Sequence, residues 1–252
     1  MWKKIAIGVV VLLVIVAGVG YYLFSNLDTY IKEAIEKYGS EATQASVTLS
    51  TVTLAISSGE GGITNFIVGN PKGFSTPNAI AVGSVTIKVD TSTVTGNGPI
   101  VIKEIDIDKP QVTYEVNDSG GNNLETIQKN AESYAGSGGG STTASGGQQR
   151  KLIIDDLYVR DGQIGVAATA LKGKNLSAPL PAIHLTNVGK SSGGATAGQV
   201  ASQILGAITS EAAKTASSQL MQSLGSSLSG MGQGGPNTGG ATGGAVKSLF
   251  GH

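Results

Sequence analysis

The side chains that most often carry out catalysis are scarce in this chain and lie far apart in the sequence. None of the 252 residues is cysteine, which excludes disulfides, thiolate catalysis and cysteine-bound metals. The two histidines are His184, within an alternating strand-like segment, and His252, so neither a metal-binding pair nor a Ser/His arrangement is evident. We therefore interpret His184 as an ordinary strand residue.

Carboxylates and glycines, which build other kinds of site, are also arranged without a recognisable motif. Glu104, Asp106 and Asp108 lie two residues apart, which places them on one solvated face of a strand and not around an ion. No Gly-Lys-Ser/Thr sequence follows a glycine cluster, so no phosphate-binding loop is predicted. The 17 basic residues equal the 17 acidic residues in number, and this balance argues against nucleic acid as a partner. We expect no enzymatic activity, no metal and no cofactor.

The first element of the chain, which precedes all of these residues, is an uncharged apolar segment, Ile5 to Phe24. As a helix it would be about 30 Å long, which is the thickness of the hydrocarbon core of a bilayer. Lys3 and Lys4 precede it and no basic residue follows until Lys32, so the N-terminus should be cytoplasmic. A cleaved signal peptide is the alternative, but its apolar core is usually shorter. We predict a single-pass membrane anchor over residues 1–25.

Two short helices are predicted from apolar residues that recur every three or four positions. The first contains Leu27, Ile35 and Tyr38 on one face, and Gly39 is a typical helix stop. The second, over residues 122–134, has a similar apolar face and an asparagine at its start. Both helices should pack on a sheet.

The segments around and between these helices have the alternation of half-buried strands. The alternating segments are 47–57, 63–68, 82–94 and 100–116. In the last of them the apolar residues of KEIDIDK are odd-numbered, Ile105 and Ile107, and those of QVTYEV are even-numbered from Val112, with Pro110 at the change. One extra residue there would return both halves to the same face of the sheet. We therefore predict one long, bent strand.

A second long strand-like segment, LIIDDLYVRDGQIGVAA, contains an Asp-Gly pair. Asp161 and Gly162 are predicted to form a two-residue hairpin turn, which would bring Val159 opposite Ile164. Further along the chain, leucines and isoleucines recur every four residues in an Ala/Ser-rich background. This pattern predicts a weakly amphipathic helix.

The predicted fold class is α+β, mainly antiparallel β, with short packing helices and a Gly-rich tail expected to be disordered. The organisation follows the changes in composition. It comprises the anchor (1–25), the first part of a β-domain (26–135), a flexible linker (136–149), the second part of the β-domain (150–190), an Ala/Ser-rich helix (191–229) and a low-complexity tail (230–252).

Twelve apolar strand residues form the candidate site. They are Val85, Ile87, Val89, Ile105, Ile107, Val112, Tyr114, Val116, Leu157, Val159, Ile164 and Val166. One hypothesis is that they are the closed core beneath the helices, because a sheet normally buries one face. The other is that part of this face is an open trough for acyl chains, because the predicted helices are few and short. Sequence alone favours the closed core.

Three motifs behind the apolar N-terminal segment resemble those of the AsmA-like proteins, a bacterial envelope family of the repeating β-groove class. They are ITNFIVGNPKGFS (63–75), IDIDKPQVTYEVNDSGGNNL (105–124) and IIDDLYVRDGQIGV (153–166). The resemblance covers roughly residues 2–189. It implies a curved sheet with an apolar inner face, a place in the bacterial inner membrane with the bulk in the periplasm, and a role in lipid transport or homeostasis.

The expected function is therefore the binding or handling of phospholipid acyl chains in an apolar groove. The predicted sheet is short for this family, because eight to ten strands at about 4.8 Å spacing span only about 40 to 50 Å. Oligomerisation or transfer to a protein partner would then be needed to bridge two membranes. The alternative function is a structural or assembly protein of the cell envelope, which binds protein partners through a sheet edge and the C-terminal helix.

Overall fold

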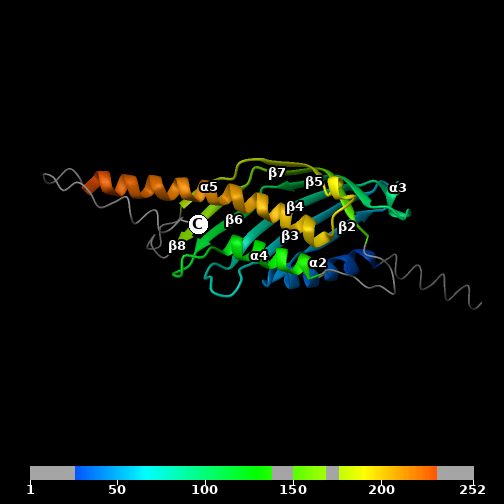
Figure 1. The fold of residues 1–252 in the computed structure, drawn as a ribbon, viewed down its shortest axis with the longest axis horizontal. Coiled ribbons are helices and arrows are strands. Elements are labelled where there is room, and N and C mark those ends of the chain that lie inside the picture. The colour runs from blue at the N-terminus through cyan, green and yellow to red at the C-terminus, as the bar shows by residue number, and fades with distance from the viewer. Residues whose placement is uncertain (1–25, 138–149, 169–175, 232–252) are drawn as a thin grey trace, which may run out of the picture.

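The computed structural model describes residues 26–137, 150–168 and 176–231. These residues form a mixed, mostly antiparallel ten-stranded sheet and four α-helices, which confirms the predicted α+β class (Figure 1). No helix within these ranges is long and apolar enough to cross a membrane. The predicted span, most of the predicted linker and the tail beyond residue 231 lie outside the described residues.

The elements alternate between groups of strands and single helices. The helices are α2 (Leu27–Thr43), α3 (Thr91–Val94), α4 (Asn123–Gly136) and α5 (Ala197–Met231), with a short 3-10 turn at Lys190–Ser192. The strands are β1 (Val47–Thr48), β2 (Thr51–Ala55), β3 (Glu60–Gly69), β4 (Asn78–Val89), β5 (Ile100–Asp108), β6 (Gln111–Val116), β7 (Leu152–Arg160), β8 (Gln163–Ala168), β9 (Leu176–Pro179) and β10 (Ile183–Val188).

Several pairs of consecutive strands lie end to end and together form one longer ribbon of the sheet. β5 and β6 both pair with β4, and β7 and β8 run parallel to β5 and β6 in the same register. β9 and β10 then pair antiparallel with β8 and β7. β1 and β2 in the same way both pair with β3. The sheet is thus built of long ribbons: β3 and β4 are continuous, and the pairs β1–β2, β5–β6, β7–β8 and β9–β10 are each interrupted once.

The interruptions line up in one row, which we call the crease. The register on either side places Ser50, Asn65, Gly83, Lys109, Asp161 and Pro181 opposite one another. Asn65, Lys109 and Asp161 have positive φ angles of 50°, 49° and 53°, a conformation that bends a strand. Because the residues of this row lie opposite one another in every ribbon, pairing continues on both sides without a change of register.

The crease explains the change from odd to even apolar positions in the sequence. Ile105 before it and Val112 and Tyr114 after it are all buried in one cluster. The predicted bent strand around Pro110 is therefore confirmed, and the residue with the unusual backbone is Lys109.

The predicted hairpin at Asp161 and Gly162 is wrong. β7 and β8 do not pair with each other, since Val159 lies beside Ile107 and Ile164 beside Val112. A hairpin turn of this type needs positive φ at both central residues, whereas only Asp161 has it here. One left-handed residue bends the strand instead of reversing it.

α2 is longer than predicted, and α5 occupies nearly the predicted range of 191–229. α2 continues past Gly39 to Thr43, because the absence of a side chain at Gly39 lets the helix lie against Val47. A Cβ atom at Gly39 would be 3.1 Å from Cγ1 of Val47. The C-terminal helix α5 is 35 residues long and is not marginal, because it buries Ile208 and other residues of its four-residue stripe against the sheet.

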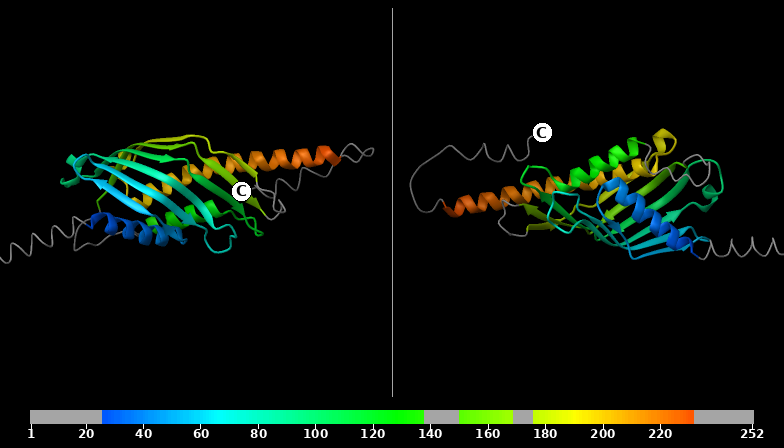
Figure 2. Two further views of the ribbon diagram at one scale, coloured as in Figure 1. Left: turned by 180° about the vertical axis from the view of Figure 1, so that it is seen from behind. Right: turned by 90° about the horizontal axis from the view of Figure 1, so that it is seen from below.

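α2, α4 and α5 lie on one side of the sheet, which we call the inner face, and the other side is open to solvent (Figure 2). α5 contacts β6, β8, β9 and β10, α4 contacts α5 and β6, and α2 runs along β1 and β2. Side chains of α2 also satisfy the backbone of that edge. The Ser40 hydroxyl and the Glu36 carboxylate accept from the amides of Val47 and Leu49, at 2.8 and 3.0 Å.

Candidate functional site

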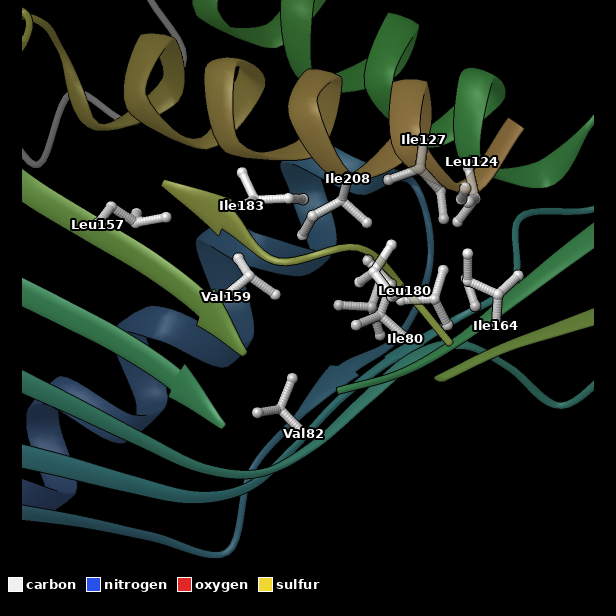
Figure 3. Packing of buried hydrophobic residues seen from close by; sticks show 14 of the residues in the cluster. Ile80, Val82, Leu124, Ile127, Leu157, Val159, Ile164, Leu180, Ile183 and Ile208 are labelled. Atoms are coloured by element: carbon white, nitrogen blue, oxygen red, sulfur yellow. The ribbon is translucent and has the colours of Figure 1, made fainter. Parts of the chain in front are cut away.

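Beyond the crease, the inner face is a closed core. Leu124 and Ile127 of α4 and Ile208 of α5 point toward the sheet, where Leu180 and Ile164 meet them (Figure 3). Ile127 and Ile164 are completely buried. An apolar ligand could enter between these helices and the strands only by displacing a helix. A separate cavity of about 640 Å³ lies at the end of this half, with Phe74, Val116 and Ala167 among its lining residues.

The twelve predicted site residues all lie on the inner face, and the structure divides them into two groups. The buried ones are Val85, Ile105, Val112, Tyr114, Leu157, Val159, Ile164 and Val166. The half-buried ones are Ile87, Val89, Ile107 and Val116. The closed-core hypothesis therefore describes the first group well, and an open trough can involve only the second.

Three of the half-buried residues belong to a continuous apolar surface on β2 to β5, before the crease. We call it the open strip, and it consists of Leu54, Ile63, Ile87, Val89, Ile102 and Ile107. Strand pairing makes them neighbours: Ile63 is opposite Val85, which in turn is opposite Ile107, and Val89 is opposite Ile102. α5 covers β10 and the strands beyond the crease, β6, β8 and β9. These six side chains are therefore left partly accessible between α5 and α2.

The helix beside the open strip is amphipathic but incompletely buried. Leu27, Ile31, Ile35 and Tyr38 of α2 are all half-buried, and only Thr43 at its end is fully buried. α2 therefore adds apolar surface along the strip instead of closing it.

A glycine pair in β3 hollows the sheet at the end of the open strip. A cavity of about 490 Å³ lies here, and its lining includes residues of both faces. Leu54, Gly61 and Ile87 belong to the inner face, and Thr53, Gly62, Thr86 and Lys88 belong to the outer face. A Cβ atom at Gly61 would meet Cδ2 of Leu54 and the carbonyl oxygen of Thr53, both at 3.6 Å, and Cβ of Ile87 at 3.9 Å. These are ordinary contacts, so the space at Gly61 can hold additional apolar atoms.

A buried polar network at the far end of the molecule fixes the closed half. The carboxylate of Glu115 accepts hydrogen bonds from the amides and hydroxyls of Ser75 and Thr76. The amide of Asn123, which is completely buried, donates to Asn70 Oδ1 at 2.7 Å and to the carbonyl of Thr113 at 2.8 Å. The network ties the 70–77 loop to β6 and to the start of α4.

Glu115 stays ionised in this network although it is only 5% exposed. Burial raises the pKa of its carboxyl, but the hydrogen bonds from Thr76 and Ser75 outweigh that effect and hold the pKa below its ordinary value. All of its oxygens are engaged by the protein, so we interpret Glu115 as a structural residue.

In the part of the chain that the structure describes, the outer face carries polar pairs and no convergent catalytic arrangement. Asp106 is paired with Arg160, and Glu104 is paired with Lys88 at 2.8 Å. His184 lies in β10, as interpreted from the sequence, with Nε2 2.7 Å from Asp156 Oδ1. No group of three or more metal-binding side chains occurs among the described residues.

Sequence reasoning missed half of the open strip, namely Leu54, Ile63 and Ile102. A signal for Leu54 is present, because the apolar positions in VTLSTVTLA change from odd to even after Leu49. This is the same change that marks Pro110 in β5 and β6.

The chain matches no model of a known protein family and no curated protein.

Proposed function

We propose that this protein is a membrane-anchored lipid-handling protein of the bacterial envelope. The uncharged segment Ile5–Phe24 would anchor it in the inner membrane, with residues from 26 onward in the periplasm. The open strip would hold phospholipid acyl chains, while the head group stays in water. The observation that carries the proposal is the partial exposure of six neighbouring apolar side chains on one face of a sheet.

Binding of this kind needs no catalytic group. Each Å² of apolar surface removed from water contributes about 25 cal/mol, so an acyl chain covering the strip would gain free energy from contact alone. The resemblance of three motifs to AsmA-like proteins supports the same substrate class. The short strip suits one lipid at a time and would not bridge two membranes.

A second candidate function is assembly with another envelope protein. It is favoured by the edge formed by β9 and β10, which pairs with β8 and β7 on one side and with no strand on the other among the described residues. Such an edge can accept an additional strand. In this case the half-buried side chains would be the rim of a core and would contact no lipid.

Photo-crosslinking at two adjacent positions of β4 tests the proposal. A photoreactive phenylalanine analogue replaces Ile87, which faces the open strip, or Thr86, which is exposed on the outer face. In the full chain in native membranes, we expect phospholipid adducts at position 87 and few at position 86, read by mass spectrometry. Equal labelling at both positions, or protein adducts alone at 87, would contradict lipid handling by the strip.

A further inference from the structure

Exposed large apolar side chains are rare on the described surface, and they are not spread evenly. They are Tyr30, Ile56, Val94 and Met221, with exposed fractions of 42%, 56%, 45% and 60%. Met221 lies on α5. The other three lie at the start of α2, in the turn between β2 and β3, and in α3, which are at the same end of the molecule (Figures 1 and 2). We call this end the α3 end.

The loops of the α3 end are joined to one another by hydrogen bonds. The amide of Val89 donates to the carbonyl of Gly59 at 2.8 Å, which joins the β2–β3 turn to the segment that leads into α3. The guanidinium of Arg150 donates to the carbonyls of Val94, Thr93 and Gly98. Asp90 caps α3 by accepting from Ser92. Ile56 and Val94 are therefore presented from loops whose backbone is held in place.

The chain enters the described fold at the same end. α2 begins at Leu27, only two residues after the uncharged segment ends at Phe24. Its contacts from Ser40 to Val47, and from Lys32 to the carbonyl of Ser50 at 3.1 Å, show that α2 runs antiparallel to β1 and β2. Its first turn is consequently beside the end of β2, next to the turn that carries Ile56.

We propose that the α3 end rests on the bilayer surface, with Tyr30, Ile56 and Val94 inserted at the boundary between head groups and acyl chains. This inference rests on the membrane anchor of the proposed function. A connection of two residues spans at most about 7 Å, so an anchored chain cannot hold this end far from the membrane. Side chains that are apolar, exposed and carried by elements at one end of the molecule fit such a boundary.

The docked orientation would also connect the bilayer with the open strip. Leu54, Val89 and Ile102 lie at the ends of β2, β4 and β5 that point toward the α3 end. An acyl chain leaving the bilayer there would meet apolar side chains first. It would reach the strip without crossing water.

The absence of cysteine from the chain allows the test to use single introduced cysteines. Full-length variants Ile56→Cys and Val94→Cys carry an environment-sensitive fluorophore in vesicles of phosphatidylglycerol and phosphatidylcholine in equal amounts. Ser119→Cys is the control, because it is exposed in the loop after β6, at the opposite end of the ribbon that begins with β5. Nitroxide-labelled lipid in the same vesicles is the quencher.

We expect the labels at positions 56 and 94 to be quenched several times more strongly than the label at 119, with emission shifted to the blue. Quenching at 56 and 94 no stronger than at 119, in protein that floats with the vesicles, would overturn the docking but leave the anchor intact. Failure to float would overturn the anchor and the docking together.

A second variant guards against an effect of the label itself. Ile56→Glu combined with Val94→Glu changes only exposed side chains and should not affect folding. In this background, a label at Tyr30→Cys should lose most of its quenching, while the protein still floats. Unchanged quenching would show that Ile56 and Val94 do not contribute to membrane contact.

Discussion

Glu115 connects three segments that are distant in the sequence. Its carboxylate holds Ser75 and Thr76 of the loop before β4, and its own amide donates to Oδ1 of Asn123 at 2.9 Å. A buried carboxylate is costly unless donors surround it. Hydrogen bonds to a charged group are stronger than those between neutral groups. Glu115 therefore stabilises the closed half of the molecule, which lies beyond the crease from the open strip.

We predict that Glu115→Gln lowers the free energy of unfolding by about 1.5 to 3 kcal/mol at neutral pH. The amide retains the shape of the side chain, but its NH2 group faces the donors of Ser75 and Thr76. Glu132→Gln on the exposed side of α4 is the matched control and should change stability by less than about 0.5 kcal/mol. Urea unfolding of the full-length variants measures both, and equal effects would contradict the role of Glu115.

The difference in unfolding free energy between wild type and Glu115→Gln should depend on pH in a direction that follows from the pKa of Glu115. Because the pKa of Glu115 is lower in the folded protein, its ionisation stabilises the fold above the unfolded pKa of about 4.3, and this contribution is lost as the pH falls through the folded pKa. The difference in stability between wild type and Glu115→Gln should therefore be constant from about pH 6 to 8 and shrink below about pH 4. A difference that grows at acid pH would be inconsistent with this assignment.

The strands show which features of an element the sequence can predict. The odd-to-even change around Pro110 was sufficient to predict a bent strand, because side-chain direction in a strand has a strict period of two. The pair Asp161-Gly162 was misleading, since the residues suit both a hairpin turn and a single left-handed bend. Only the long-range pairing of β7 with β5 and of β8 with β6 decides between the two, and that pairing is not encoded locally.

The left-handed residue at the crease gives a prediction for β7 and β8. Asp161 has φ of +53°, so Asp161→Gly should be neutral or stabilising, whereas Asp161→Val should cost about 1 to 2 kcal/mol. Gln163→Val is the control, because Gln163 is exposed in the same ribbon and pairs regularly with Gln111. Thermal unfolding ranks the three variants. A Val variant at 161 that is as stable as the one at 163 would argue against a left-handed residue at the crease.

At the scale of the whole molecule, the sequence predicted which side chains share a face but not which of them are covered. Val159 and Ile107 are neighbours in paired strands and have the same pattern in the sequence. Val159 is 1% exposed, while Ile107 is half-buried. The difference arises from the path of α5, for which the sequence predicted only weak amphipathicity. Two alanines of α5, Ala212 and Ala216, are in fact completely buried, because small side chains allow the helix to approach closely.

Because Val159 is buried and Ile107 is half-buried, introducing a charge at each of the two positions should have different effects. Val159→Asp would place an unpaired carboxylate in the closed core and should destabilise the protein by more than about 3 kcal/mol. Ile107→Asp can direct its carboxylate toward solvent and should cost about 1 kcal/mol, the loss of a partly buried apolar side chain. If the open strip holds acyl chains, Ile107→Asp should nevertheless lose the lipid adducts formed at position 87. Circular dichroism follows the fold of both variants. A folded Ile107→Asp protein that keeps its adducts would place the lipid elsewhere, and an unfolded one would mean that the strip belongs to the closed core.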